Sequence, residues 1–119
     1  MSAGNIVFVD RTGGLLFRTS YAALSERFRV IWSDTAEHTL SHVGRLGADV
    51  HCVVMAADEV SNDDSLSLVS RLRRQGVPVV ASCATLGQAI ALLSAGAQEV
   101  LRRPHTTKEL VSRVNAAAP

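Results

Sequence analysis

The chain has few of the residues that mark disulfide cross-linking or base stacking. Its 119 residues include only two cysteines and three prolines. A domain of this size buries enough surface to fold without cross-links, and Cys52 and Cys83 both lie within apolar runs, so we expect two reduced, buried thiols. The aromatic side chains are three Phe, one Tyr and one Trp, too few for a platform that stacks nucleic-acid bases. The core is therefore expected to be aliphatic.

Neither sign of charge dominates, and no long apolar run is present. Twelve basic side chains face eleven acidic ones, for a net charge of +1, which argues against a nucleic-acid surface. The first residues have no basic segment leading into an apolar stretch, so no signal peptide is expected. The apolar runs are shorter than the roughly 20 residues of a membrane-spanning helix. We therefore expect a soluble, cytoplasmic protein with no membrane partner.

Strand-length apolar runs alternate with helical patterns five times along the chain. The expected strands are residues 6–10, 28–32, 50–56, 78–83 and 99–101. The expected helices are residues 15–26, 34 or 35 to 45, a third one that ends at Gln75, 85–95 and 106–116. Five such units predict a doubly wound α/β fold, a parallel five-stranded sheet between two layers of helices. In this fold ligands and reactive groups collect at the carboxyl ends of the strands.

Several segments carry a more specific pattern. Residues 77–84 read Val-Pro-Val-Val-Ala-Ser-Cys-Ala, residues 95–104 run from Ala-Gly-Ala to Arg-Arg-Pro, and Asp10 ends the first apolar run. Together with Gly47-Ala48-Asp49-Val50, these segments resemble a response-regulator receiver domain of the CheY-like type. The resemblance covers the whole chain and implies a flavodoxin-like three-layer sandwich with strand order 2-1-3-4-5. It also implies bacterial two-component signal transduction, with residues 1–119 forming one receiver-like domain, alone or at the start of a longer regulator with an output domain.

The chain departs from this family at its phosphorylation pocket. Receivers hold Mg²⁺ with an acidic pair after the first strand and accept the phosphoryl group on an aspartate that ends the third. They also carry a hydroxyl after the fourth strand and a lysine after the fifth. The resemblance places these residues of the chain at the five positions and at the position of the family's switch aromatic: Asp10, Arg11, Val54, Cys83, Arg103 and Val100. Of these, only Asp10 keeps the family's chemistry.

We therefore expect a pseudo-receiver that transfers no phosphoryl group, binds no metal or cofactor and is not an enzyme. One alternative is a functional receiver that uses Asp58 as acceptor, with Asp10 and a divalent ion. Another is a sensor of a small anion at the turn from Arg11 to Gly14, which lies before a helix N-terminus. Within the pocket, Arg11 and Arg103 are candidates to neutralise Asp10.

The output of such a domain would be protein contact. The resemblance places the interaction face on residues 86–95, 98–102 and 106–114, with either a protein partner or a second copy of the chain as its occupant. The candidate contact residues are Leu92, Leu93, Val100, Arg102 and Leu110.

Other polar groupings favour structural roles. His38 and His42 have the spacing of a metal pair but lack a third ligand, so they are expected on a solvated helix face. Asp63 and Asp64 suit the start of the third helix, and Arg71, Arg73 and Arg74 suit its end. His51 and Cys52 are adjacent on a strand and should point to opposite faces.

Overall fold

The sheet has the strand order that the sequence predicts. The computed structural model describes residues 4–10, 14–57 and 62–117. The strands are β1 (Asn5–Val9), β2 (Arg29–Ser33), β3 (Val50–Ala56), β4 (Val79–Cys83) and β5 (Glu99–Arg102). They form one five-stranded parallel sheet in the order β2-β1-β3-β4-β5. The expected flavodoxin-like, doubly wound fold is confirmed.

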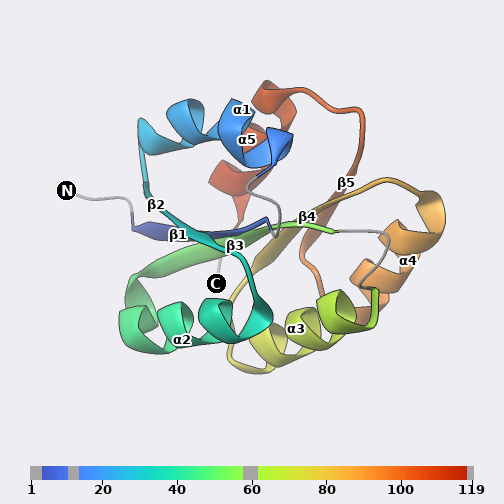
Figure 1. Cartoon of the computed structure of the whole chain (residues 1–119), viewed down its shortest axis with the longest axis horizontal. Helices are drawn as coiled ribbons and strands as arrows, with labels where there is room; N and C mark the ends of the chain where they lie inside the picture. The colour runs from blue at the N-terminus through green and yellow to red at the C-terminus, as the bar shows by residue number, and fades with distance from the viewer. Residues whose placement is uncertain (1–3, 11–13, 58–61, 118–119) are drawn as a thin grey trace.

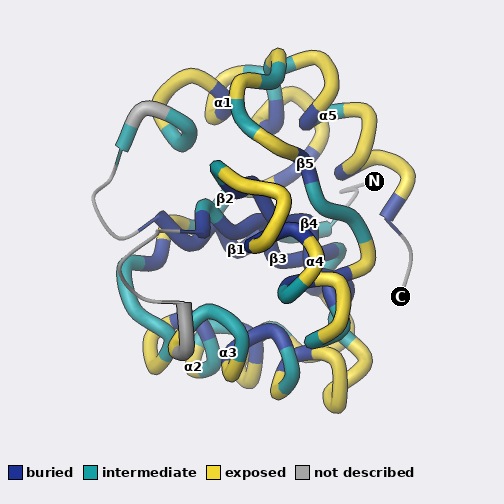
Figure 2. Tube along the Cα trace, turned by 90° about the vertical axis from the view of Figure 1, so that its right-hand side faces the viewer, coloured by how far each residue is buried: buried dark blue, intermediate teal, exposed yellow. Residues whose placement is uncertain are grey.

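Helices cover both faces of this sheet. They are α1 (Leu15–Ser25), α2 (Ala36–Leu46), α3 (Asn62–Arg74), α4 (Leu86–Ala95) and α5 (Thr107–Ala116), with a 3-10 helix (Gly47–Asp49) before β3. Figures 1 and 2 show α1 and α5 side by side on one face, with α2, α3 and α4 on the other. Among the described residues, no helix combines the length and the apolar character needed to cross a membrane.

The core divides into two clusters, one on each face of the sheet. Ile6, Phe8, Cys52 and Val54 point toward α1 and α5, where they meet side chains that include Leu110. The alternate strand residues, among them Val53 and Met55, pack against α2, α3 and α4. Almost all of these side chains are aliphatic, as the scarcity of aromatics predicts. Burial of apolar surface on both faces is what holds the three layers together.

Threonines fix where three of the helices begin. Thr35, Thr85 and Thr106 precede α2, α4 and α5, and each side chain accepts a hydrogen bond from the N–H three residues later. Such caps satisfy backbone donors that a helix leaves unpaired at its first turn. In α1 the capping position is Gly14, which has no side chain to offer.

Strand β3 contains one irregularity that sets its register. Asn5 pairs with Val50 but Ile6 pairs with Cys52, so His51 is an extra residue opposite β1. The His51 ring packs 4.7 Å from the Phe28 ring, and its Nε2 donates to the Val114 carbonyl oxygen at 2.7 Å. The extra residue therefore ties β3 to the last turns of α5.

Candidate functional site

Asp10 lies at the carboxyl end of β1 and is almost fully buried. Its carboxylate oxygen Oδ2 accepts a hydrogen bond from the Phe17 N–H at 3.4 Å, in the first turn of α1. Its backbone carbonyl accepts from Trp32 Nε1 at 2.9 Å, and its own N–H donates to the Ser33 carbonyl. The carboxylate thus supplies the acceptor that Gly14 cannot provide for α1, and its negative charge suits a helix N-terminus.

The carboxyl end of β3 consists of alanines. Val9 pairs with Met55, which brings Asp10 level with Ala56, and the Ala57 N–H continues the ladder to the Ser82 carbonyl oxygen. Val54 lies two residues earlier, is fully buried, and packs in the cluster under α1 and α5. The prediction that Val54 lines the pocket is therefore wrong. The extra residue at His51 accounts for one of the two positions by which the count from Asp49 stops short of the edge.

Arg103 follows β5 and reaches across the ends of two neighbouring strands. Its Nη1 donates to the Ser82 carbonyl oxygen at 3.0 Å and to the Ser82 hydroxyl at 3.2 Å, while Nη2 donates to the Ala57 carbonyl oxygen at 3.0 Å. The ion pairs between described residues are His38–Asp34 and Arg113–Glu99. The expected ion pair of Arg103 with Asp10 is therefore not formed, and the guanidinium binds backbone carbonyls instead.

The Ser82 hydroxyl links Arg103 to His105. It is fully buried and lies 2.8 Å from His105 Nε2, and His105 Nδ1 lies 3.3 Å from the Thr106 carbonyl oxygen. A guanidinium only donates and a carbonyl only accepts, so Arg103 donates to the Ser82 hydroxyl and His105 Nδ1 donates to the Thr106 carbonyl oxygen. Between the Ser82 hydroxyl and His105 Nε2, either atom can be the donor.

Cys83 does not share the environment of Ser82. Its thiol is buried on the opposite face of β4, among residues of α3 and α4, and donates weakly to the Thr85 carbonyl oxygen at 3.5 Å. Burial raises the pKa of the Cys83 thiol, which the nearby Arg103 opposes. Burial also raises the pKa of Cys52 to about 12. Both cysteines are free and buried, as predicted, and their chemistry is that of neutral thiols.

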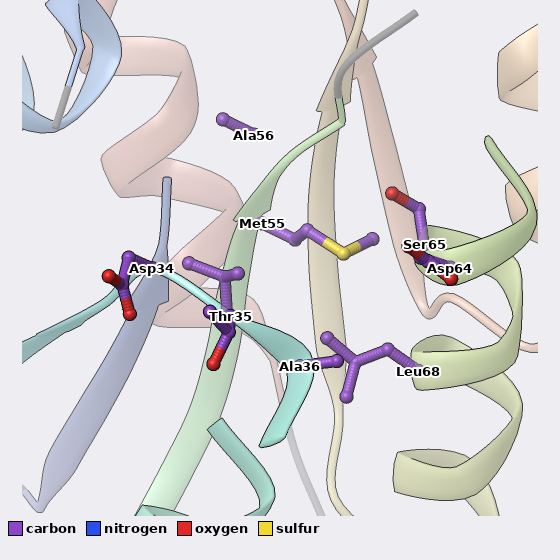
Figure 3. Close-up of a pocket in the computed structure, with 9 residues that line it drawn as sticks. Asp34, Thr35, Ala36, Met55, Ala56, Asp64, Ser65 and Leu68 are labelled. Carbon is purple, nitrogen blue, oxygen red and sulfur yellow. The ribbon is translucent and has the colours of Figure 1, made fainter. Parts of the chain in front are cut away.

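A cavity of about 50 Å³ opens between the starts of α2 and α3. Figure 3 shows Asp34 on one side of it, with Asp64 and Ser65 on the other and Met55 between them. A hydrogen bond from His38 Nδ1 at 2.7 Å lowers the pKa of Asp34. Within the described ranges, no cluster of three or more His, Cys, Asp or Glu is placed to hold a metal ion. The cavity has room for a few water molecules and not for a nucleotide.

Three of the predicted positions lie outside the described residues. These are Arg11, the turn from Arg11 to Gly14 apart from Gly14 itself, and the alternative acceptor Asp58. The anion site at that turn and the acceptor role of Asp58 therefore stay predictions.

The predicted interaction face is only partly on the surface. Leu92 and Leu110 are buried core residues and cannot form surface contacts, so both predictions are wrong. Arg102 is exposed and Val100 is half-buried. Leu93 is 50% exposed, and it continues a stripe with Leu86 and Ile90, each 57% exposed. The α4 stripe, defined as Leu86, Ile90 and Leu93, follows the spacing of one helix side.

Sequence reasoning missed Ser82 and His105, and it did not single out Leu86 and Ile90 within the predicted face of residues 86–95. The pairing of Ser82 with His105 depends on the turn between β5 and α5, for which the sequence gives no signal. The exposed side of α4 is hard to read because apolar residues occur all round this helix. A count of Leu86, Ile90 and Leu93 at intervals of four and three residues could have found the stripe.

Sequence comparisons give no family assignment. No protein-family model matches the chain. No curated protein matches it either.

Comparison with solved structures finds the same fold in many response regulators. A CheY-like protein, TadZ of Pseudomonas aeruginosa, superposes with a TM-score of 0.80 at 16% identity, over 97% of this chain and 99% of that one. A response regulator receiver domain protein of Clostridium thermocellum gives a TM-score of 0.81 at 17% identity, over 96% and 93% of the two chains. Full-length FixJ of B. japonicum gives 0.77 at 23% identity, with 98% of this chain covering 58% of that one. The chain therefore has the CheY-like fold of receiver domains.

Proposed function

We propose that the chain is an atypical response-regulator receiver domain that signals through protein contact without accepting a phosphoryl group. The partner in this contact is a second copy of the chain, which binds through the α4 stripe and the neighbouring surfaces of β5 and α5. The comparisons support the CheY-like fold of the chain, and the role of a receiver domain is what we propose for it.

The observation that carries the first half is the carboxyl end of β3. Phosphoryl transfer needs an acceptor carboxylate beside a cation that neutralises the developing charge. Here the end of β3 offers the methyl groups of Ala56 and Ala57 in place of a carboxylate, and Arg103 uses three of its N–H groups to bind Ser82 and Ala57. Asp10 is likewise bound to the first turn of α1. These bonds support the view that the side chains of Arg103 and Asp10 are held in one arrangement at the carboxyl ends of the strands.

The second half is supported by the α4 stripe. Large apolar side chains at three successive positions of one helix side are costly to leave in water, and such patches mark protein contacts. Beside the stripe, Glu99 and Arg113 form an ion pair at 2.9 Å and Arg102 is exposed. A surface that carries both signs of charge can meet a second copy of itself, which an isologous dimer requires.

The first test asks whether the domain is phosphorylated. The purified chain is incubated with Mg²⁺ and acetyl phosphate, and its intact mass is measured under mild conditions. We expect no added phosphoryl group. A phosphoryl adduct mapped to Asp58 would overturn the proposal in favour of a functional receiver. An ordinary receiver treated in parallel shows that the phosphodonor is active.

The second test addresses the α4 stripe. Sedimentation equilibrium is measured for the native chain and for Ile90→Asp and Leu93→Asp. We expect the native chain to self-associate and each substitution to raise the dissociation constant by at least about tenfold. Tyr21→Asp is the matched control, because Tyr21 is an apolar side chain on α1 with 45% exposure. A monomeric native chain, or equal weakening by the control, would contradict the proposal.

A further inference from the structure

A second, larger cavity lies on the opposite side of the sheet from the α4 stripe. Its volume is about 650 Å³, and it lies between the first half of α1 and the connection from β5 to α5. Figure 2 shows α1 and α5 side by side at the top of the molecule. It shares Arg103 with the predicted receiver pocket, and Thr106 and Thr107 with the predicted contact face, but Leu16, Thr19, Pro104 and His105 belong to neither. The lining residues are Leu16, Thr19, Arg103, Pro104, His105, Thr106 and Thr107.

The lining has the character of a small-molecule site. Leu16 and Pro104 provide apolar surface, and the threonines provide hydroxyl groups. Arg103 supplies a permanent positive charge and His105 an imidazole, and none of the described lining residues carries a carboxylate. Sites for small ligands have volumes of about 300–1,000 Å³, mostly apolar walls and a few convergent polar groups. The electrostatic preference of this cavity is for an anion.

The two basic groups are held in place before any ligand arrives. Arg103 is fixed by three hydrogen bonds to Ser82 and Ala57, and His105 by its bonds to Ser82 and Thr106. The hydrogen bonds of Arg103 to Ser82 and Ala57 use Nη1 twice and Nη2 once, and the guanidinium has five N–H groups. Donor capacity therefore remains for an anion, and little side-chain entropy is lost when one binds.

We propose that this cavity binds a small amphipathic organic anion. A ring or branched chain of the ligand packs on Leu16 and Pro104, and its carboxylate or phosphate group binds Arg103. Charge complementarity selects the anionic group, and the apolar walls select an organic body over an inorganic ion. Such a ligand would give the domain an input that does not depend on phosphoryl transfer. Binding of this ligand does not depend on whether the chain acts as the proposed receiver domain.

The experiment is an amide NMR titration with three probes that separate the two halves of the ligand. Phenyl phosphate carries both, inorganic phosphate only the charge, and benzyl alcohol only the ring. We expect saturable shifts at the amides of Leu16, Thr19, His105 and Thr107 with phenyl phosphate. We expect at least about tenfold weaker binding of each of the other two probes. Shifts that do not saturate by about 10 mM, or that map elsewhere, would overturn the proposal.

Variants decide whether the cavity itself is responsible. Arg103→Gln should weaken phenyl phosphate binding at least about tenfold, and Arg102→Gln, on an exposed neighbour outside the lining, should not change it. Because Arg103 also links two strands, Thr19→Glu is a second test: Thr19 is exposed, and a carboxylate there should repel the anion without disturbing the core. Leu93→Asp should bind phenyl phosphate as the native chain does. Binding unaffected by both Arg103→Gln and Thr19→Glu would refute the site, whatever the outcome for self-association.

Discussion

At the scale of single residues, the carboxylate of Asp10 caps the first turn of α1. The carboxylate accepts from the Phe17 N–H while the backbone of the same residue bonds to Trp32 and Ser33. A residue that the family resemblance associates with Mg²⁺ is thus used here to start a helix. The local reason is Gly14, whose missing side chain leaves the first turn of α1 without a cap of its own.

Asp10→Ala should destabilise the fold by about 1–2 kcal/mol, because it removes a cap acceptor and a helix-end charge. The measurement is urea unfolding followed by circular dichroism. Asp10→Asn keeps an acceptor oxygen and should cost less. Millimolar Mg²⁺ should leave the stability of the native chain unchanged. A clear stabilisation by Mg²⁺ that Asp10→Ala abolishes would show instead that the carboxylate serves a metal.

Cys52 should be unreactive while the protein is folded. Burial raises the pKa of its thiol from 9.0 to about 12, and only the thiolate is a good nucleophile. Iodoacetamide near pH 8 should therefore leave Cys52 unmodified in native protein, and should modify both cysteines in urea, as read by mass spectrometry. The raised pKa also means that this burial stabilises the fold fully below pH 9.0, and progressively less as pH rises toward about 12. Rapid native labelling of Cys52 would contradict this.

At the scale of elements, the strands and helices could be predicted because each is coded locally. Apolar runs bounded by turns gave all five strands, and Thr35 and Gly47 marked the ends of α2 as expected. The orientation of α4 could not be predicted in this way. Its apolar residues leave no polar side to indicate solvent, so Leu92 was expected at the surface although it is buried.

Glycine at the end of a helix and glycine within a helix respond differently to substitution. Gly96 ends α4 at φ +119°, and a Cβ placed there would overlap the side chain of Arg73. Gly44 lies within α2, and a Cβ there would meet nothing within 4 Å. Gly96→Ala should therefore lower the free energy of unfolding by at least about 1–2 kcal/mol, whereas Gly44→Ala should raise it by about 0.5–1 kcal/mol.

Thermal and urea unfolding of the two variants would check this pair. Equal effects at the two positions would show that backbone conformation does not decide the outcome.

At the scale of the whole molecule, the fold was predictable and the site was only partly so. The alternation of strands and helices fixes a parallel sheet and its carboxyl edge, which brings Asp10, Ser82 and Arg103 to the same end. Which groups bond there depends on small offsets, such as the extra residue at His51 and the turn that brings His105 to Ser82. Such offsets are three-dimensional, and no local pattern in the sequence encodes them.

Self-association through the α4 stripe should be visible in stability. Binding of a second copy to the folded state alone shifts unfolding by mass action, so the midpoint temperature should rise with protein concentration. Ile90→Asp should abolish this dependence without lowering the midpoint measured at low concentration. Scanning calorimetry over a hundredfold range of concentration is the measurement. A midpoint that is independent of concentration in the native chain would argue for a monomer.

Trp32 is the chain's single tryptophan, and its indole N–H is bound to the carbonyl oxygen of Asp10. Since the ring is 42% exposed, its emission depends both on water and on the position of that one peptide group. The protein thus carries an intrinsic fluorophore at the end of β1. Its emission maximum and lifetime will register any rearrangement of this edge in the unlabelled, native chain, at concentrations far below those that NMR requires.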